Sequence, residues 1–359
     1  DRVVATLAHL LSSPVAMGPP FALLRADGGP AIGLGHLMRS LALGEGLVEL
    51  GWKVALASSG APAAVIKAAE AASIDHHQIG GPSGAGQDAE RVVSLRPDLV
   101  VVDGYHFDIS FYRTLAMLRC AHAVIDDNSE TEAVEPILIV NQNPHAQASM
   151  YAQFPKATLL LGLRFALLRR AVREIGPGES QERIRPRVLI SIGGSDPLDL
   201  TISIAREAAQ LDVDLRVAIG PSNCRGNEIR GMVETIDNAS VVDPRAYAAE
   251  LAASDFAIIG AGSTLWEAAY LGVPTIGLIV AENQHSSSRA ANLNGFTHTI
   301  DGRAPHAEFI AKAALSELMA DPLRSSAMIE AGRRSVDGLG ARRVGVALAA
   351  AMDGRPENG

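Results

Sequence analysis

The stretch FALLRADGGPAIGLGHLMRSLALGEGLVELG, residues 21–51, joins an apolar run to an amphipathic one through a glycine-rich turn. Its first six residues predict a buried β-strand, and the leucines after the turn recur at helical spacing until Gly51 ends the pattern. Gly33 and Gly35 allow a tight turn with room for a ligand, and the N–H groups that open the helix can bind an anion. Such a strand–turn–helix unit is typical of a doubly wound parallel sheet.

A histidine at the start of that helix adds a group that a phosphate-binding turn does not need. His36 follows Gly35 directly, so the turn reads G-L-G-H-L-M and lacks the third glycine of the dinucleotide motif G-x-G-x-x-G. An imidazole is suited to acid–base chemistry near neutral pH. Two interpretations remain open, a catalytic base beside a phosphate and a tight turn with an incidental histidine, whereas NAD or FAD binding is disfavoured.

Composition and charge narrow the class of protein. The 359 residues suffice for two domains, and 48% apolar but 4% aromatic residues favour helix-covered parallel sheets. The net charge of −9 without a dense Lys/Arg stripe argues against nucleic acid as a partner. The two cysteines, Cys120 and Cys224, indicate a reducing compartment and no disulfide framework. No apolar run of about 18 residues is present, so we expect a cytoplasmic protein without a membrane span.

Strand-like and helix-like segments alternate along the whole chain, with one interruption. The charged stretch RRAVREIGPGESQERIRPR, residues 169–187, is the predicted linker between an N-terminal domain at 21–168 and a C-terminal domain at 188–350. Residues 1–20 are expected to be a poorly ordered extension rather than a signal peptide, because their apolar section is broken and lacks a basic cluster. Two α/β halves on either side of a linker imply a cleft between them.

A double glycine follows the first strand of the second half. Gly193, Gly194 and Ser195 could let a ligand approach the backbone, with the serine hydroxyl donating to a phosphate. Asp196 and Pro197 fit equally well as the cap and first turn of a helix, which is a structural role. The residues themselves leave both readings open.

A second glycine cluster in this half carries more polar groups. Gly262, Ser263 and Thr264 stand where a strand becomes a helix, and offer free N–H groups and two hydroxyls to a diphosphate. Glu267 shares that end of the helix, four residues after Ser263, and could accept hydrogen bonds from two ribose hydroxyls. The alternative is a capped amphipathic helix in which Glu267 balances the helix dipole.

The remaining polar candidates are weaker. Asn283 and Gln284 follow the next strand and suit sugar hydroxyls and N-acetyl groups, although Asn283 could simply cap a helix. Asp126 and Asp127 could chelate a metal, but no histidine or third carboxylate lies nearby in sequence, so no metal is expected. Asp75–His77 is expected in a surface loop. The serines lack the G-x-S-x-G context of a serine hydrolase.

Seven segments carry a resemblance, and they occur in this order: RADGGPAIGLGHLMRSLAL, VVDGYHFD, VIDDNS, NQNPHAQASMY, LGLRFALLRR, IGGSDP and GAGSTLWEAAYLGVP…ENQ. With these segments the chain resembles the glycosyltransferase-B superfamily. Within that superfamily it is similar to the UDP-2,4-diacetamido-2,4,6-trideoxy-β-L-altropyranose hydrolase family of pseudaminic acid biosynthesis. The resemblance runs from Phe21 to the AENQH segment.

The resemblance implies two Rossmann-like domains facing a cleft, with UDP held mainly by the second domain and the sugar reaching toward the first. His36 matches the family's catalytic histidine, which would activate water to attack the anomeric carbon with inversion, without a metal or other cofactor. The positions implied for the sugar are Asp27, Gly33, Gly35, Arg39, Asp103, Tyr105, Asn283 and Gln284. Those implied for UDP are Gly193, Gly194, Ser195, Gly262, Ser263, Thr264 and Glu267.

Departures from the family pattern leave the identity of the sugar undetermined. Gly104 stands where the family often has a histidine before Tyr105, and Pro144-His145 replaces a simpler run. A glycosyltransferase with a UDP-sugar donor is the alternative function, whereas the presence of His36 counts against a non-catalytic binding subunit. We expect a monomer or weak dimer whose partner is a small UDP-sugar.

Overall fold

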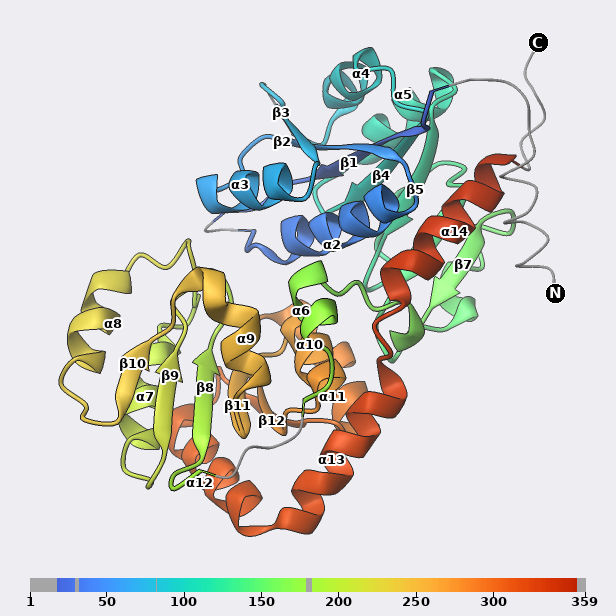
Figure 1. Ribbon diagram of the computed structural model, residues 1–359. Helices are drawn as coiled ribbons and strands as arrows, with labels where there is room; N and C mark the ends of the chain where they lie inside the picture. The colour runs from blue at the N-terminus through green and yellow to red at the C-terminus, as the bar shows by residue number, and fades with distance from the viewer. Residues whose placement is uncertain (1–17, 30–31, 82, 179–182, 354–359) are drawn as a thin grey trace.

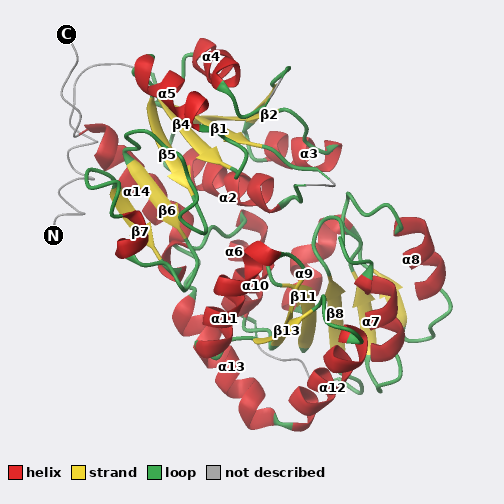
Figure 2. Ribbon diagram, turned by 180° about the vertical axis from the view of Figure 1, so that it is seen from behind, coloured by secondary structure: helices red, strands yellow, loops and turns green. Residues whose placement is uncertain are grey.

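The computed structural model describes residues 18–29, 32–81, 83–178 and 183–353 (Figure 1). Most of the extension expected at 1–20 therefore lies outside the described residues, as does part of the linker expected at 169–187. Two parallel β-sheets, each with helices on both faces, make up the chain, and Figure 2 shows the same two layered units from behind.

The first sheet contains seven strands in the order β3-β2-β1-β4-β5-β6-β7, all paired in parallel. Their bounds are β1 Phe21–Ala26, β2 Lys53–Ser58, β3 Asp75–Gln78, β4 Leu99–Asp103, β5 Ala121–Ile125, β6 Leu138–Asn141 and β7 Thr158–Leu161. The helices and 3-10 turns between them are α2 Gly35–Glu49, α3 Ala63–Ala71, α4 Gly86–Ser94, α5 Ile109–Met117, η1 Ala148–Tyr151 and η2 Leu163–Phe165. The strand and helix predicted around the opening turn are present.

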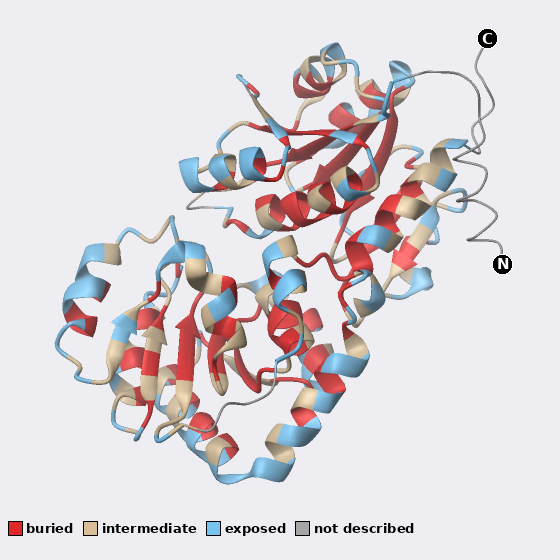
Figure 3. Cartoon of the chain, viewed as in Figure 1, coloured by how far each residue is buried: buried red, intermediate tan, exposed pale blue. Residues whose placement is uncertain are grey.

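Successive residues of β1 serve the two faces of this sheet. Ala22 and Leu24 belong to the core under α2, whereas Leu23 between them belongs to the core under α4 and α5. Such alternation follows from the two-residue period of a strand, and it explains why a strand buried on both faces reads as one apolar run. Figure 3 shows the buried strands at the centre of the layers.

The second sheet contains six parallel strands in the order β10-β9-β8-β11-β12-β13. Their bounds are β8 Arg187–Ser191, β9 Asp214–Val217, β10 Ala239–Val241, β11 Phe256–Gly260, β12 Thr275–Ile279 and β13 His298–Asp301. The helices and 3-10 turns are α7 Leu200–Ala208, α8 Gly226–Val233, η3 Pro244–Ala246, α9 Tyr247–Ala252, α10 Thr264–Leu271, η4 Glu282–Gln284, α11 His285–Leu293, α12 Ala307–Ala320 and α13 Pro322–Ser335.

Each sheet reverses its strand order at one point. The reversal falls between β1 and β4 in the first sheet and between β8 and β11 in the second. In doubly wound sheets a crevice opens at the carboxyl ends of the strands at such a point. The turns that leave β1 and β8 carry the glycines singled out from the sequence.

One segment predicted as a loop forms a strand instead. Asp75–His77 lies in β3, an edge strand that pairs with β2 only. The expectation of a surface loop was wrong because an edge strand is stabilised by backbone hydrogen bonds on one side and keeps polar side chains exposed. A polar four-residue strand therefore leaves no apolar pattern to detect.

The chain passes between the domains twice. The short helix α6, Arg170–Ile175, lies between the two sheets in Figure 1, and the last helix, α14 at Gly340–Asp353, returns to the first domain. Ala341, Val344 and Leu348 of α14 belong to the same apolar core as α2. The predicted division at 21–168 and 188–350 stays a prediction. The end of the second range, in α14, packs on the first domain.

Gly46 sets the distance between α2 and α14. A Cβ atom added there would lie 2.9 Å from the Cβ of Ala341, closer than real Cβ atoms come, whereas Gly231 in α8 has open space around it. We predict that Gly46→Leu lowers the free energy of unfolding by about 1–3 kcal/mol through overpacking. The same change at Gly231 should leave it equal or higher, because leucine favours a helix over glycine. Urea unfolding midpoints measure both, and equal midpoints for the two variants would contradict this packing.

Candidate active site

The turn between β1 and α2 has the conformation expected from its glycines. Gly33 has a φ of +82°, and its backbone N–H and C=O exchange hydrogen bonds with Gly29. A non-glycine residue is strained at that φ, so this position explains the glycine. The turn delivers His36 into the first turn of α2, where it is 7% exposed.

His36 forms a hydrogen-bonded pair with the carboxylate that ends β4. The distance from His36 Nδ1 to Asp103 Oδ1 is 2.7 Å, and Asp103 is fully buried. An ionised carboxylate only accepts hydrogen bonds, so in the neutral imidazole this contact favours the tautomer with the proton on Nδ1 and the lone pair on Nε2. Among the residues that the structure describes, nothing is hydrogen-bonded to Nε2.

Arg39, one turn after His36, binds two carboxylates at once. Its Nε and Nη2 donate to Asp103 at 2.6 Å each, and its Nη1 donates to both oxygens of Asp127 at 2.7 Å. Burial alone would raise the pKa of Asp103, but Arg39 and His36 lower it below its ordinary value. Burial likewise opposes ionisation of Asp127, whose pKa Arg39 and Tyr105 lower to about 2. Both carboxylates are therefore charged at neutral pH.

Tyr105 links this cluster to the second domain. Its hydroxyl donates to Asp127 Oδ2 at 2.6 Å and accepts from Asn283 Nδ2 at 3.3 Å, and its ring meets His36 edge-on at 4.9 Å. Burial and the charge of Asp127 raise the pKa of the phenol above its ordinary value, so it remains a proton donor. The sequence-predicted residues His36, Arg39, Asp103, Tyr105 and Asn283 thus meet across the domain boundary.

Asp27 lies at the same sheet edge but in a different network. Both of its oxygens accept hydrogen bonds, from Arg25 and the Ser59 backbone on one side and from Arg25, Ser83 and His106 on the other. Burial raises the pKa of Asp27, but the hydrogen bonds of His106 and Arg25 outweigh it and lower the pKa well below its usual range. The carboxylate holds these loops together, and the contact with a sugar implied by the resemblance stays a prediction.

The glycine turn after β8 approaches the turn after β1. Gly193 has a φ of +69°, and a Cβ atom on Gly194 would lie 2.8 Å from Leu34 of the first domain. Asp196, in contrast, caps α7 by accepting hydrogen bonds from the backbone of Leu200 and Thr201. Asp196 thus has the structural role of binding the first N–H groups of the helix, although Asp199 is the N-cap residue. The expectation of a first-turn proline was wrong, because Pro197 precedes the helix, which begins at Leu200. The predicted phosphate contacts of Gly193, Gly194 and Ser195 remain untested.

The second glycine cluster stands at the start of α10. Ser263 is the N-cap residue of this helix, yet its side chain makes no capping hydrogen bond, so the hydroxyl remains available. A Cβ atom on Gly262 would lie 4.0 Å from Gln284 Nε2, which brings the ENQ segment beside this turn. Gln284 Oε1 accepts from the Val280 backbone at 2.9 Å. Gly262, Ser263 and Gln284 therefore share one edge of the second sheet, and Thr264 begins the helix.

Glu267 is buried and bound by a residue that the sequence did not single out. Arg169, the first residue of the predicted linker, donates from Nε and Nη2 to the two oxygens of Glu267 at 2.7 Å each. The sequence shows that the linker is charged, but the pairing of Arg169 with a residue 98 positions away depends on the tertiary fold. Asn143, whose Nδ2 donates to Asp127 Oδ1 at 2.7 Å, was missed for the same reason.

Asp126 and Asp127, considered as a metal pair, have separate surroundings. Asp127 is neutralised by Arg39, whereas burial raises the pKa of Asp126, whose Oδ2 has no hydrogen-bond partner among the described residues. Within the described ranges, no group of three or more His, Cys, Asp or Glu residues is placed to hold a metal ion.

The helices of the described chain include none long and apolar enough to cross a membrane.

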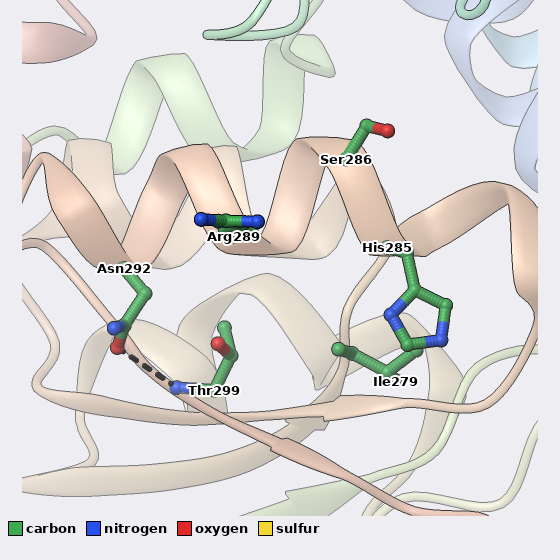
Figure 4. Close-up of a pocket in the computed structure, with 6 residues that line it drawn as sticks. All are labelled: Ile279, His285, Ser286, Arg289, Asn292 and Thr299. Carbon is green, nitrogen blue, oxygen red and sulfur yellow. Dashed lines mark hydrogen bonds between the residues drawn. The ribbon is translucent and has the colours of Figure 1, made fainter.

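The second domain contains a hollow of about 320 Å³ between α11 and the strands β12 and β13 (Figure 4). It is lined by Ile279, His285, Ser286, Arg289, Asn292 and Thr299. Asn292 Oδ1 accepts from the Thr299 backbone at 3.3 Å, so part of its polar lining is already paired. None of the site residues predicted from the sequence lines it.

Comparisons of the sequence with known proteins give one distant relative. No family model matches the chain. An uncharacterized protein of Methanocaldococcus jannaschii is 23% identical over 271 residues, which are 72% of this chain and 55% of that protein. The chain thus spans about half the length of the curated relative it matches.

Solved structures resemble almost the whole chain. The kitacinnamycin glycotransferase matches with a TM-score of 0.67 and 17% identity, covering 93% of this chain and 99% of that one. Acinetobacter baumannii MurG matches at 0.62 and 16%, covering 91% and 98%, and S. aureus MnaA in a structure with UDP at 0.65 and 13%, covering 90% and 94%. Similarity at this level shows the fold, so the predicted glycosyltransferase-B fold is confirmed.

The depressed pKa of Asp127 makes stability depend on pH in a defined direction. A carboxylate whose folded pKa is about 2 against an ordinary 3.8 stabilises the fold fully above pH 4 or so, and this contribution is lost as the pH falls toward 2. About 1 kcal/mol should be lost by pH about 3. We predict that the urea midpoint of the wild type falls further between pH about 6 and about 3 than that of Asp127→Asn.

The matched control for this measurement is Asp212→Asn, since the Asp212 side chain is 79% exposed beside Arg185. Exposed ion pairs contribute little, so this variant should retain the pH dependence of the wild type. A wild-type pH dependence in Asp127→Asn would contradict the contribution assigned to Asp127.

Proposed function

We propose that the chain is a nucleotide-sugar hydrolase that releases UDP from a UDP-linked diacetamido-trideoxyhexose, in the biosynthesis of a nonulosonic acid of the pseudaminic type. The observation that carries the proposal is the pair of His36 and Asp103, which leaves one imidazole nitrogen free at the edge where the two glycine turns meet. The fold shared with a glycotransferase and with a protein solved with UDP supports a UDP-sugar as the substrate class.

In this proposal His36 is the general base. Its Nε2 takes a proton from water as the water oxygen bonds to the anomeric carbon, and the bond from that carbon to the phosphate oxygen breaks with inversion. Asp103 holds the imidazole in the required tautomer and stabilises the imidazolium that forms. Arg39 acts through Asp103, because it keeps that carboxylate ionised.

The second domain receives the leaving group. UDP departs with both bonding electrons, and its added negative charge lies against Gly193–Ser195 and Gly262–Thr264. The backbone N–H groups and hydroxyls of these two turns would donate to it, apart from the N–H of Gly262, which donates to the Gly260 carbonyl at 2.8 Å. A helix N-terminus is suited to this task, since its unpaired N–H groups and dipole favour an anion. Among the described residues the phosphate charge has these donors available without a metal, so no divalent ion is part of the proposal.

A glycosyltransferase remains the second candidate, because the kitacinnamycin glycotransferase has the same fold over nearly its whole length. The same base would serve it, with the hydroxyl of an acceptor in the place of water. The two functions therefore differ in what occupies the space beside His36 Nε2, and the assay has to be run without any acceptor.

The experiment is incubation of the purified protein with UDP-activated diacetamido-trideoxyhexoses in EDTA, followed by proton NMR of the products. We predict free sugar and UDP in equal amounts, with the inverted anomer appearing first. His36→Asn should bind UDP but lose turnover by about 10² to 10⁴, which is typical for removal of a general base. No free sugar without an acceptor, and transfer once an alcohol is supplied, would replace the hydrolase with the transferase.

His306→Asn is the matched control. His306 is exposed at the start of α12 with a φ of +63°, a conformation that asparagine tolerates. It should turn over at the wild-type rate. A similar rate in His36→Asn would remove His36 from the mechanism.

A further inference from the structure

The interdomain linker binds the buried carboxylate at the start of α10. Arg169 uses Nε and Nη2 on the two oxygens of Glu267, which is 6% exposed. This two-point contact fixes the plane of the carboxylate as well as its position, which a single ammonium group cannot do. The orientation of Glu267 is thus set from outside the helix that carries it.

Arg169 is itself held against the glycine-rich edge of the second domain. Its guanidinium lies 5.4 Å from the centroid of the Tyr247 ring. Burial and the charge of Glu267 raise the pKa of Tyr247 to about 12, while the neighbouring Ser191 and Thr264 oppose this rise. Ser191 ends β8 and Thr264 begins α10, so the Arg169 side chain rests on a packed group that includes both elements.

The backbone beside Arg169 is attached to the first domain. The N–H of Arg170 donates to Glu45 of α2, and Arg173 pairs with Glu49 of the same helix at 2.7 Å. Helix α2 begins at the turn that carries His36. The linker segment therefore joins the helix of the proposed base to the carboxylate at the proposed nucleotide edge.

We propose that Arg169 is a positioning residue for nucleotide binding: it orients Glu267 so that the free lone pairs of the carboxylate accept hydrogen bonds from the ribose hydroxyls of a nucleoside diphosphate. The inference rests on the proposed function, which supplies the nucleotide. A carboxylate offers about four acceptor sites, and the arginine fork uses two of them. Glu267 lies one turn after Ser263, whose side chain makes no capping hydrogen bond, so in this proposal the remaining sites lie at the helix end that would receive the nucleotide.

The experiment compares two ligands that differ only in the ribose hydroxyls. Dissociation constants of UDP and 2′,3′-dideoxy-UDP are measured by calorimetry for the wild type, Arg169→Lys, Glu267→Gln and Arg173→Lys. The wild type should prefer UDP by about tenfold to a hundredfold, as hydrogen bonds to a charged group imply. Arg169→Lys keeps the charge but loses the fork, so its preference should fall to about threefold or less while dideoxy-UDP binds as before.

The two further variants complete the test. Glu267→Gln should show the same reduced preference, and combining it with Arg169→Lys should reduce the preference no further, because the two residues act through one contact. Arg173→Lys, on the same short helix and paired with a partly exposed Glu49, should keep the wild-type preference.

The outcomes separate the inference from the function on which it rests. A wild-type preference in Arg169→Lys, or equal weakening of both ligands, overturns the positioning role and leaves the proposed function standing. A wild type that binds UDP and dideoxy-UDP equally overturns the ribose role of Glu267, and the inference with it. A wild type that binds neither ligand overturns the proposed function as well.

Discussion

The buried guanidinium of Arg39 is the interaction on which the arrangement of the candidate site depends. It joins the carboxylate that ends β4 to the one that follows β5, and both would otherwise repel each other inside the protein. Without this cation, burial would favour the protonated form of each carboxyl group. A neutral Asp103 could not fix the tautomer of His36, and Asp127 would lose its cationic partner and keep the hydrogen bond from Tyr105. One arginine therefore sets the charge state of the whole cluster.

The two domains bring complementary groups to this cluster. In the proposed function, the first supplies a base and its supporting carboxylates from a turn that glycine makes possible, and the second supplies the start of α10 and hydroxyls. The contact of Leu34 with Gly194 and the hydrogen bond of Asn283 to Tyr105 keep the two turns close. This arrangement would suit acid–base chemistry beside an anion, because the proposed base lies in one domain and the proposed anion-binding groups lie in the other.

Local patterns in the sequence predicted much of this structure. The glycine turn, the strand before it and the helix after it are all short-range features, so residues 21–51 alone were sufficient to predict the first unit. The strand β3 was not predictable, because an edge strand of polar residues has no apolar period. The contacts of Arg39 with Asp103 and Asp127, and the pairing of Arg169 with Glu267, could not be predicted from local patterns, since ion pairs between distant segments depend on the completed fold. Glu267 was predicted from the sequence as a ribose-binding carboxylate, whereas its partner Arg169 was not predicted.

The central claim is that water attacks the anomeric carbon of a nucleotide sugar beside His36. Turnover in water enriched in oxygen-18, followed by mass spectrometry of both products, tests it directly. The account predicts one labelled oxygen at the anomeric position of the free sugar and none in the released UDP. Label in the phosphate would place the cleavage at the phosphorus–oxygen bond, and would contradict a base that activates water toward carbon.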